Sequence, residues 1–174
     1  MDDAALVARA QAGDRRAFAA LVRRHEAMVY RVCSRVLGNR EDAEDAAQEA
    51  FLRAYRKLGT FRGESAFATW LLRLAVNVSL NERARRRGWP WSRARADPVG
   101  GTAAGPEAEV LHAEAAAQLH RALQALRPDH RAAVILRDLE GLTYGEVAAA
   151  LGVPEGTAKG WAHRGRKRLK ELLT

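Results

Sequence analysis

The sequence lacks most features that mark secreted, metal-binding or membrane-spanning proteins. Among its 174 residues there is one cysteine, Cys33, so neither an intrachain disulfide framework nor a multi-cysteine zinc site is possible. No apolar run approaches the roughly 18–20 residues that a membrane span needs. The first residues, MDDAALVARA, are acidic and lack the basic-then-apolar order of a secretory signal. We therefore expect a cytoplasmic protein with no direct membrane insertion.

Signatures of common enzymes are also missing. The chain contains no GxxxxGK[ST], GxGxxG, GxSxG or HExxH pattern. Its five histidines share no ligand spacing with the cysteine or with a carboxylate pair. Cys33 lies on the apolar stripe of a predicted helix, which favours a core thiol over a nucleophile. We predict no catalytic residue, no metal site and no cofactor.

Basic charge, by contrast, is abundant and unevenly placed. Lys and Arg number 29 against 21 Asp and Glu, giving a net charge of +8 at pH 7, which favours a polyanionic partner. Residues 88–110 carry few charges, with 2 basic and 3 acidic residues. The stretch 88–106 is rich in Gly and Pro, a composition that resists both helix and sheet. We predict a domain at 1–87, a flexible linker at 88–106 and a domain at 107–174.

Apolar residues in both domains recur at helical spacing. In the first domain this spacing predicts helices from Asp14 to Gly38-Asn39, at about 41–58 and at about 65–87. In the second domain, one helix carries Leu119 and Leu123 and another begins at Pro128, where a first helical turn tolerates proline. No segment alternates apolar and polar residues over the length of a strand. The predicted fold is all-α, with two small helical domains.

The clearest local pattern lies near the C-terminus. Thr143 and Glu146 have the spacing of a capping box, Gly152 is placed for a left-handed turn, and Pro154-Glu155 opens a second helix. This order is typical of a helix-turn-helix, whose second helix enters the major groove of DNA. From residue 156 to 170 the second helix has no acid and six cations, which favours DNA contact over a merely solvated basic face.

The predicted helix at 41–58 has the opposite charge. Five acids lie between residues 41 and 49, with no basic residue between Arg40 and Arg53. Paired carboxylates can bind metals, but no His follows any of them at the Glu-x-x-His spacing of di-iron bundles. Acids beside Gln48 and Leu52, which we expect to be exposed, indicate a protein-docking surface instead.

The predicted helix at 65–87 ends in NERARRR and is followed by Trp89 and Trp91. Arginines, asparagines and nearby aromatics suit single-stranded nucleic acid, because bases stack on aromatic rings and guanidinium groups pair with phosphates. The alternative is core packing for Trp70, which we favour for that residue, and a solvated arginine run for the rest.

Three segments together resemble bacterial sigma factors. Residues 42–58 (DAEDAAQEAFLRAYRKL) are similar to the helix that binds core RNA polymerase, and 61–87 to the −10-element segment. Residues 136–173 are similar to the helix-turn-helix that recognises the −35 element. The whole chain resembles the extracytoplasmic-function (ECF) group, the smallest class, which retains only the second and fourth sigma regions.

The resemblance implies site residues for each segment. Matching the docking site of the polymerase beta-prime clamp helices are Asp45, Gln48, Glu49, Phe51 and Leu52. Matching the −10 DNA-binding segment, including its specificity loop, are Gly63, Ser65, Arg73, Asn77, Asn81 and Arg85. Matching the −35 recognition helix are Thr157, Lys159, Trp161, Arg164 and Arg168.

The resemblance also implies partners: core RNA polymerase through its beta-prime clamp helices and beta flap, promoter DNA, and an anti-sigma factor, which in this family is often membrane-bound. The recognition helix departs from the usual pattern, since GTAKGWAHRGR replaces a sequence close to GTVKSRLHRAR. Because Ala158 and Ala162 are smaller than the usual apolar residues, we expect looser packing here. Gly160 and Gly165 each weaken a helix interior by about 1 kcal/mol relative to alanine.

Two other functions are alternatives to the hypothesis that the chain is a sigma factor. A stand-alone helix-turn-helix transcriptional regulator would use the acidic helix as a dimer surface and bind half-sites one helical turn apart. A helical carboxylate metalloenzyme would hold near-stoichiometric iron or manganese.

Overall fold

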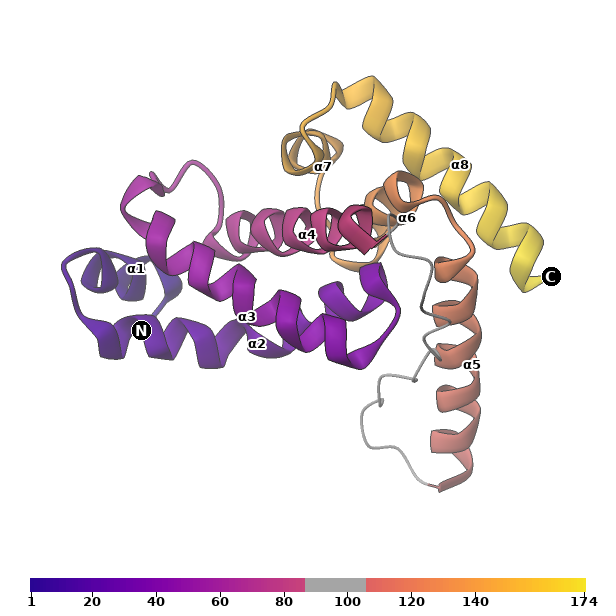
Figure 1. Cartoon of the computed structure of the whole chain (residues 1–174), viewed down its shortest axis with the longest axis horizontal. Coiled ribbons are helices and arrows are strands. Elements are labelled where there is room, and N and C mark those ends of the chain that lie inside the picture. Colours follow the sequence, from indigo (N-terminus) through magenta and orange to yellow (C-terminus); the bar gives the residue numbers. More distant parts are fainter. Residues whose placement is uncertain (87–105) are drawn as a thin grey trace.

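The computed structural model describes residues 1–86 and 106–174, and that part of the chain contains helices and no strand (Figure 1). The N-terminal part comprises α1 (Asp3–Gln11), α2 (Arg15–Leu37), α3 (Arg40–Lys57), the 3-10 turn η1 (Leu58–Thr60) and α4 (Phe67–Arg86). The C-terminal part comprises α5 (Pro106–Gln124), α6 (Pro128–Val134), the π-helical turn η2 (Ile135–Leu139), α7 (Tyr144–Leu151) and α8 (Glu155–Leu173). The predicted all-α fold is confirmed. The predicted linker, with Trp89 and Trp91, lies outside the described residues except at Pro106, where α5 begins.

Local capping sets the helix ends that the sequence predicts. The Asp14 carboxylate accepts hydrogen bonds from the backbone N–H groups of Arg16 and Ala17, at 2.9 and 3.2 Å, which satisfies donors that an uncapped first turn leaves free. Gly38 ends α2 in the left-handed conformation, with φ at 89°. The Asn39 side chain then accepts from the backbone N–H of Asp42 at 2.9 Å and opens α3.

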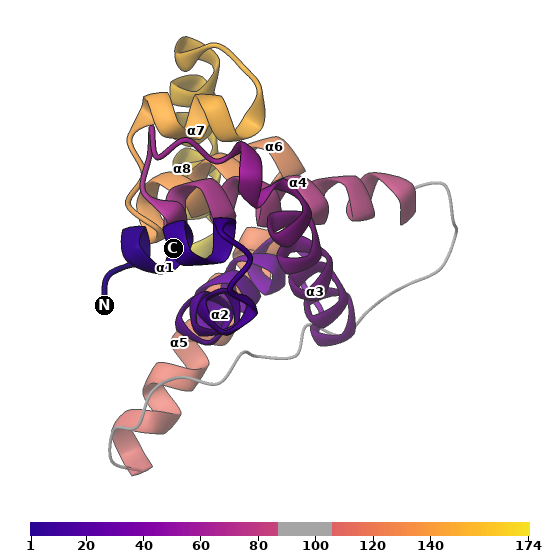
Figure 2. The same cartoon turned by 90° about the vertical axis from the view of Figure 1, so that its left-hand side faces the viewer.

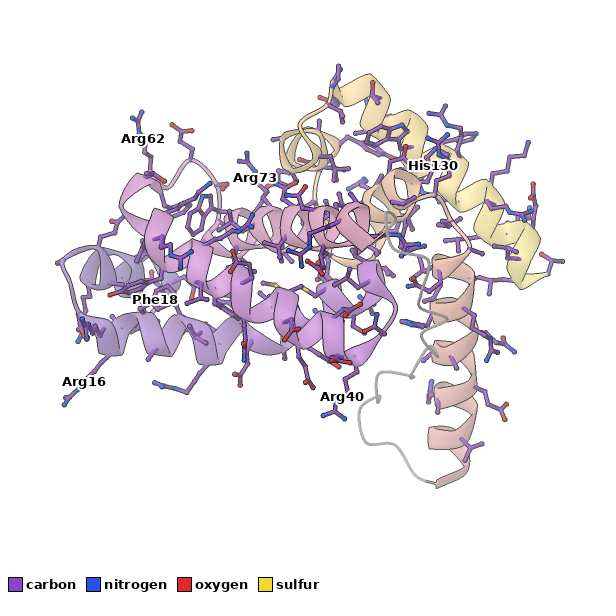
Figure 3. The ribbon with its side chains drawn as sticks, viewed as in Figure 1. Arg16, Phe18, Arg40, Arg62, Arg73 and His130 are labelled. Carbon is purple, nitrogen blue, oxygen red and sulfur yellow. The ribbon has the colours of Figure 1, made fainter. Side chains whose placement is uncertain are left out.

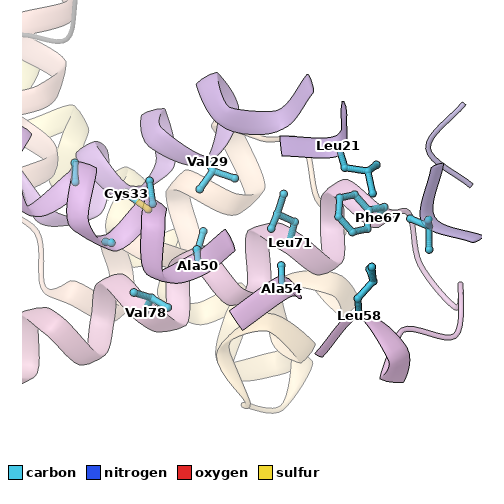
Figure 4. Close-up of a cluster of buried hydrophobic side chains, with 14 of the residues drawn as sticks. Leu21, Val29, Cys33, Ala50, Ala54, Leu58, Phe67, Leu71 and Val78 are labelled. Carbon is cyan, nitrogen blue, oxygen red and sulfur yellow. The ribbon is translucent and has the colours of Figure 1, made fainter. Parts of the chain in front are cut away.

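The N-terminal core lies between α2, α3 and α4 (Figure 4). Helix α3 supplies it mainly with alanines, among them Ala50 and Ala54, which let this helix approach its neighbours closely. Cys33 is buried here, and burial raises the pKa of its thiol to about 11, so the predicted core thiol is confirmed. Trp70 is half-buried and packs against the edge of this core beside Phe61 and Phe67, at ring-centroid distances of 5.1 and 5.7 Å.

A second core joins the two halves of the chain. Its C-terminal members include Leu123, Ile135, Leu136, Val147 and Ala162, all buried. Val32 and Val36 of α2 and Leu72 and Val76 of α4 belong to the same cluster. Figures 1 and 2 show α7 lying on α4, on the side away from α3, and α5 crossing the C-terminal end of α2. The sequence predicts two domains on a tether but not this shared core.

Arg131 lies inside the domain interface, with none of its surface exposed. Its guanidinium donates to the Val36 carbonyl at the end of α2, at 2.6 Å, and to the carbonyls of Leu123, Gln124 and Leu126 at the end of α5, at 2.6, 2.6 and 3.0 Å. Carbonyls in a last helical turn have no partner within the helix and carry the negative end of its dipole. Arg131 therefore satisfies the ends of two helices at once.

Helix α8 packs tightly on α6, against expectation. Ala158, Ala162 and Gly165 are all buried on the face of α8 that contacts α6 and α7. A Cβ atom on Gly165 would lie 2.5 Å from Val134 Cγ2 and 3.1 Å from the His130 carbonyl oxygen. The prediction of looser packing is wrong, because the small residues bring the helix axes together rather than leaving a gap.

Candidate nucleic-acid and protein interfaces

An exposed row of mixed character runs along α3. Asp45, Gln48 and Leu52 are spaced by three and four residues and are exposed on one face, and the side of the helix opposite them is buried. Leu52, an apolar side chain between polar ones, is 50% exposed. Glu49 lies at the edge of the row and pairs with Arg53 at 2.7 Å. Phe51 is half-buried and packs against the N-terminal core, so the structure separates it from the other four predicted residues.

The apolar part of this surface continues onto α2. Tyr55, 49% exposed, contacts Phe18 edge-on at a ring-centroid distance of 5.0 Å. Both rings line an open cavity of about 580 Å³ that Arg15 and Arg23 border. Sequence reasoning did not select these residues, although the spacing of Leu52 and Tyr55 on one helix face could have indicated them.

Polar residues form a second row along α4. Arg73, Asn77 and Asn81 follow one another at intervals of four residues, so they share a face. Asn77 and Asn81 are exposed and Arg73 is half-buried. Arg85, one turn further along, pairs with Glu82 at 2.8 Å. These four predicted residues therefore lie along one side of α4.

The loop before α4 holds the remaining predicted −10 residues. Gly63 adopts a φ of 73°, which favours glycine, and Ser65 follows it. Figure 3 shows Arg62, in this loop, and Arg73, on α4, pointing to the same side of the molecule. Loop and helix therefore present cations to one side, as binding of a polyanionic strand requires. Gly63 and Arg85 lie at opposite ends of α4, which spans about 30 Å at 1.5 Å per residue.

The predicted helix-turn-helix is present as α7 and α8. Thr143 and Glu146 form the reciprocal capping box, with hydrogen bonds of 3.2 Å and 2.8 Å. Gly152 ends α7 with a φ of 67°, and α8 begins at Glu155. Both predicted boundaries are confirmed.

The predicted −35 residues divide between two sides of α8. Positions 157, 161, 164 and 168 recur at helical spacing and share one side. Trp161 on this side is half-buried and packs against the shared core, whereas Arg164 and Arg168 are exposed. Lys159 is about half a turn away, where it pairs with Glu155 at 3.1 Å.

A cluster of cations surrounds Tyr144 on the Lys159 side of α8. Arg166 donates to the Tyr144 hydroxyl at 2.6 Å and pairs with Asp138 at 2.8 Å. The hydrogen bond from Arg166 holds the pKa of Tyr144 below its usual value. Arg137 and Lys159 lie over the ring, 4.7 and 5.7 Å from its centroid. This cluster could not be predicted from the sequence, because its members come from three separate elements.

The chain matches known protein families over both of its halves. Residues 21–89 match the family model for sigma-70 region 2, and residues 116–169 match the model for sigma-70 region 4. The chain is 39% identical to the RNA polymerase sigma-H factor of Pseudomonas aeruginosa, in an alignment covering 98% of this chain and 93% of that protein. It belongs to the sigma-70 family. The chain is also 38% identical to the ECF RNA polymerase sigma-E factor of Escherichia coli K12, over 97% of this chain and 93% of that one. Among solved structures, CnrH in complex with the cytosolic domain of CnrY superimposes with a TM-score of 0.71 at 26% identity, covering 98% of this chain and 96% of CnrH.

Membership in this family, in its ECF group, establishes the class of function. The protein is a promoter-specificity subunit that binds core RNA polymerase and promoter DNA and starts transcription, and it is not an enzyme. Neither the stand-alone regulator nor the metalloenzyme finds support in these matches. Within residues 1–86 and 106–174, no helix is long and apolar enough to cross a membrane.

Proposed function

We propose that this sigma factor divides its work among three helices, within a region 2 domain at 1–87 and a region 4 domain at 107–174 joined by a linker at 88–106. Helix α3 binds the beta-prime clamp helices of core RNA polymerase, α4 and its preceding loop bind and melt the −10 element, and α8 contacts the −35 element. The observation that carries this proposal is the exposed row of Asp45, Gln48 and Leu52 on a helix whose opposite face is buried.

The composition of this row supports protein binding. An exposed leucine flanked by polar side chains has the anatomy of an interface centre with a hydrophilic rim. Leu52 supplies apolar area, while Gln48 and Asp45 can form hydrogen bonds and ion pairs that fix the partner's orientation. Phe51, packed against the core, supports the helix from behind.

The surfaces of α4 and α8 support nucleic-acid binding in different ways. Asn77 and Asn81 offer amide donors and acceptors that can pair with the edges of unstacked bases, and Arg73 offers a phosphate contact. On α8, Thr157, Arg164 and Arg168 are available to the major groove of duplex DNA. The cations around Tyr144 lie on the other side of α8 and suit the DNA backbone, whose phosphates position a protein without specifying sequence.

Two further partners and a location complete the proposal. The beta flap of polymerase binds the region 4 domain. An anti-sigma factor holds the protein inactive, a role supported by CnrH, which was solved in complex with the cytosolic domain of CnrY. The protein acts in the cytoplasm, where bacterial polymerase transcribes.

Leu52→Ala tests the role of α3. We expect the affinity for bacterial core RNA polymerase to fall about tenfold, because the apolar area that a leucine side chain buries at an interface centre contributes about 1.5–3 kcal/mol. Native mass spectrometry and pull-down measure the one-to-one complex. Arg40→Ala is the matched control, since Arg40 is exposed on the same helix but lies off the row. Equal binding by wild type and Leu52→Ala, with circular dichroism unchanged, would exclude this face of α3 from the polymerase interface.

A further inference from the structure

Helix α1 carries none of the residues assigned to polymerase or to DNA. Figure 1 shows it at the end of the N-terminal part where the chain turns into α4. Leu6 and Val7 are buried on its inner face, and the helix contacts α2, η1 and α4. Because η1 leads into the loop that we assign to the −10 element, the contacts between α1 and η1 bear on DNA binding.

Polar contacts at both ends hold α1 on α2. At its start, Asp3 receives a hydrogen bond from Arg24 at 2.6 Å. At its end, Arg9 pairs with Asp14, the N-cap of α2, at 2.5 Å, and the backbone N–H of Asp14 donates to the Arg9 carbonyl at 3.0 Å. The backbone of Gln11, which lies between Arg9 and Asp14, is therefore fixed relative to α2.

Gln11 connects this fixed helix to η1. Its side-chain amide nitrogen donates to the carbonyl oxygens of Leu58 and Phe61, both at 2.9 Å. A side-chain amide has two N–H groups, so each carbonyl can receive one of them. Leu58 begins η1 and Phe61 follows it directly, with the Phe61 backbone N–H donating to the Leu58 carbonyl at 3.1 Å. One side chain of α1 thus holds both ends of this turn.

The loop at 62–66 begins where η1 ends, and it contains Gly63 and Ser65, two of the proposed −10 contacts. At the far end of the loop, Phe67 begins α4, and its ring meets that of Phe61 edge-on at a centroid distance of 5.9 Å. Within the loop, every residue except Ser65 is exposed. Contacts at the two ends, rather than burial, therefore determine where this loop lies.

A loop that selects a base must hold its polar groups at a defined place, since groups that can shift lose their discrimination. We propose that Gln11 is a positioning residue for the loop at 62–66. By holding η1 on α1, it sets where the loop meets a base of the −10 element, and therefore how strictly that base is selected. Gln11 itself makes no contact with DNA in this role. The role rests on the proposed function, which assigns the loop to the −10 element.

Gln11→Met tests this role, because methionine has a similar length but no donor for the two carbonyls. Holoenzyme formed with bacterial core RNA polymerase transcribes a barcoded promoter library randomised across the −10 and −35 elements. We expect the base preference at one −10 position to fall about fivefold, since one hydrogen bond shifts an equilibrium by about 2–10-fold. Preferences at the other −10 positions and at the −35 positions should stay as in wild type.

The ratios between bases separate positioning from mere stability. A loss of stability lowers the amount of active holoenzyme and reduces all transcripts in proportion, so it leaves these ratios unchanged. Gln118→Met, at an exposed glutamine of α5, is the matched control and should change no preference. Gln11→Lys returns a donor to this position and should discriminate more strictly than Gln11→Met.

Hydrogen exchange tests the contact itself in the free protein. The backbone N–H of Phe61, which donates to Leu58, should exchange with deuterium about fivefold faster in Gln11→Met than in wild type, because the turn opens more often. Nuclear magnetic resonance measures this rate without polymerase or DNA. An equal rate in both proteins would show that Gln11 does not hold η1.

The transcription results can contradict the proposal in two ways. Equal preferences in wild type and Gln11→Met refute the positioning role, and so does an equal fall at −10 and −35 positions. A Gln11→Lys protein that discriminates as poorly as Gln11→Met refutes the part assigned to the donated hydrogen bonds. If the wild-type holoenzyme shows no preference at any −10 position, the proposed function fails, while exchange at Phe61 still decides whether Gln11 holds η1.

Discussion

Replacing Gly165 with alanine tests the close contact between α8 and α6. Alanine is favoured over glycine in a helix interior by about 1 kcal/mol, so propensity alone predicts a more stable protein. The added methyl group, however, would lie 2.5 Å from Val134 Cγ2 and 3.1 Å from the His130 carbonyl oxygen. Val134 is a buried, branched side chain and the His130 oxygen belongs to the backbone, so neither can move away without a cost in free energy.

The expected sign follows from comparing the two effects. Extra methyl groups forced into a packed core typically cost about 1–3 kcal/mol, and a contact as short as this one belongs at the upper end. We therefore expect Gly165→Ala to lower the free energy of unfolding by about 1–2 kcal/mol after the gain in propensity. The control, Gly160→Ala on the same helix, places its methyl 3.3 Å from the guanidinium of Arg164, the far end of an exposed, flexible side chain. It should raise stability by up to about 1 kcal/mol.

Urea unfolding followed by circular dichroism at the helical minimum measures both variants. The two substitutions are chemically identical and lie five residues apart, so their difference, about 2–3 kcal/mol, isolates the contact with α6. If Gly165→Ala proves as stable as Gly160→Ala, then α8 does not approach α6 as closely as described and the small residues of this helix need another explanation.

Two further predictions concern buried groups. Arg131→Leu should lower the free energy of unfolding by about 3–5 kcal/mol, because it removes four hydrogen bonds to backbone carbonyls, three of them buried. Arg121→Leu, at an exposed position of α5, should change the free energy of unfolding by less than about 0.5 kcal/mol. Similar urea midpoints for the two variants would contradict the role of Arg131. Cys33 should react with a thiol-specific disulfide reagent at pH 8 at least about 100-fold more slowly in the folded than in the unfolded protein, because a rise in pKa from 9.0 to about 11 removes about 99% of the thiolate. Between pH 9 and 11 the thiol ionises only in the unfolded state, so it does not affect the free energy of unfolding below about pH 9 and lowers it by up to about 2.7 kcal/mol as the pH rises through 11. Cys33→Ala should lack that part of the fall. Identical profiles of stability against pH for the two proteins would refute the raised pKa of Cys33.

Features set by neighbouring residues could be predicted from the sequence. Asp14, Gly38 and the Thr143–Glu146 capping box act on backbone groups within a few positions, so their effect does not depend on the rest of the fold. The row of Asp45, Gln48 and Leu52 likewise follows from helical periodicity alone. The inward packing of Phe51 follows from the same periodicity, although this residue adjoins the row in sequence.

Features that depend on distant partners could not be predicted. Val32, Val36, Leu72 and Val76 have the spacing of ordinary core residues, and no local pattern indicates that they pack against the C-terminal half. Arg131 is one of 29 basic residues in the sequence, and only the meeting of two helix ends explains its burial.

The packing of the small residues on α8 also depends on a distant partner, so the sequence alone predicts it wrongly. Ala158, Ala162 and Gly165 are small relative to the family pattern, which suggested missing contacts. Whether a small residue leaves a cavity or permits close approach depends on the position of the facing helix, and α6 lies close enough to use the space.

The shared core also delays completion of folding until the end of the protein's synthesis. Val36 and Arg131 are 95 positions apart, so the end of α2 leaves the ribosome long before the side chain that caps it is made. At about 5–20 residues per second, the 88 residues after position 86 take about 4–18 s to translate. During that interval the nascent N-terminal domain exposes Val32, Val36, Leu72 and Val76 to solvent, and chaperones that bind short apolar segments have a defined target. Completion of the last helices, rather than folding of the first domain, ends that exposure.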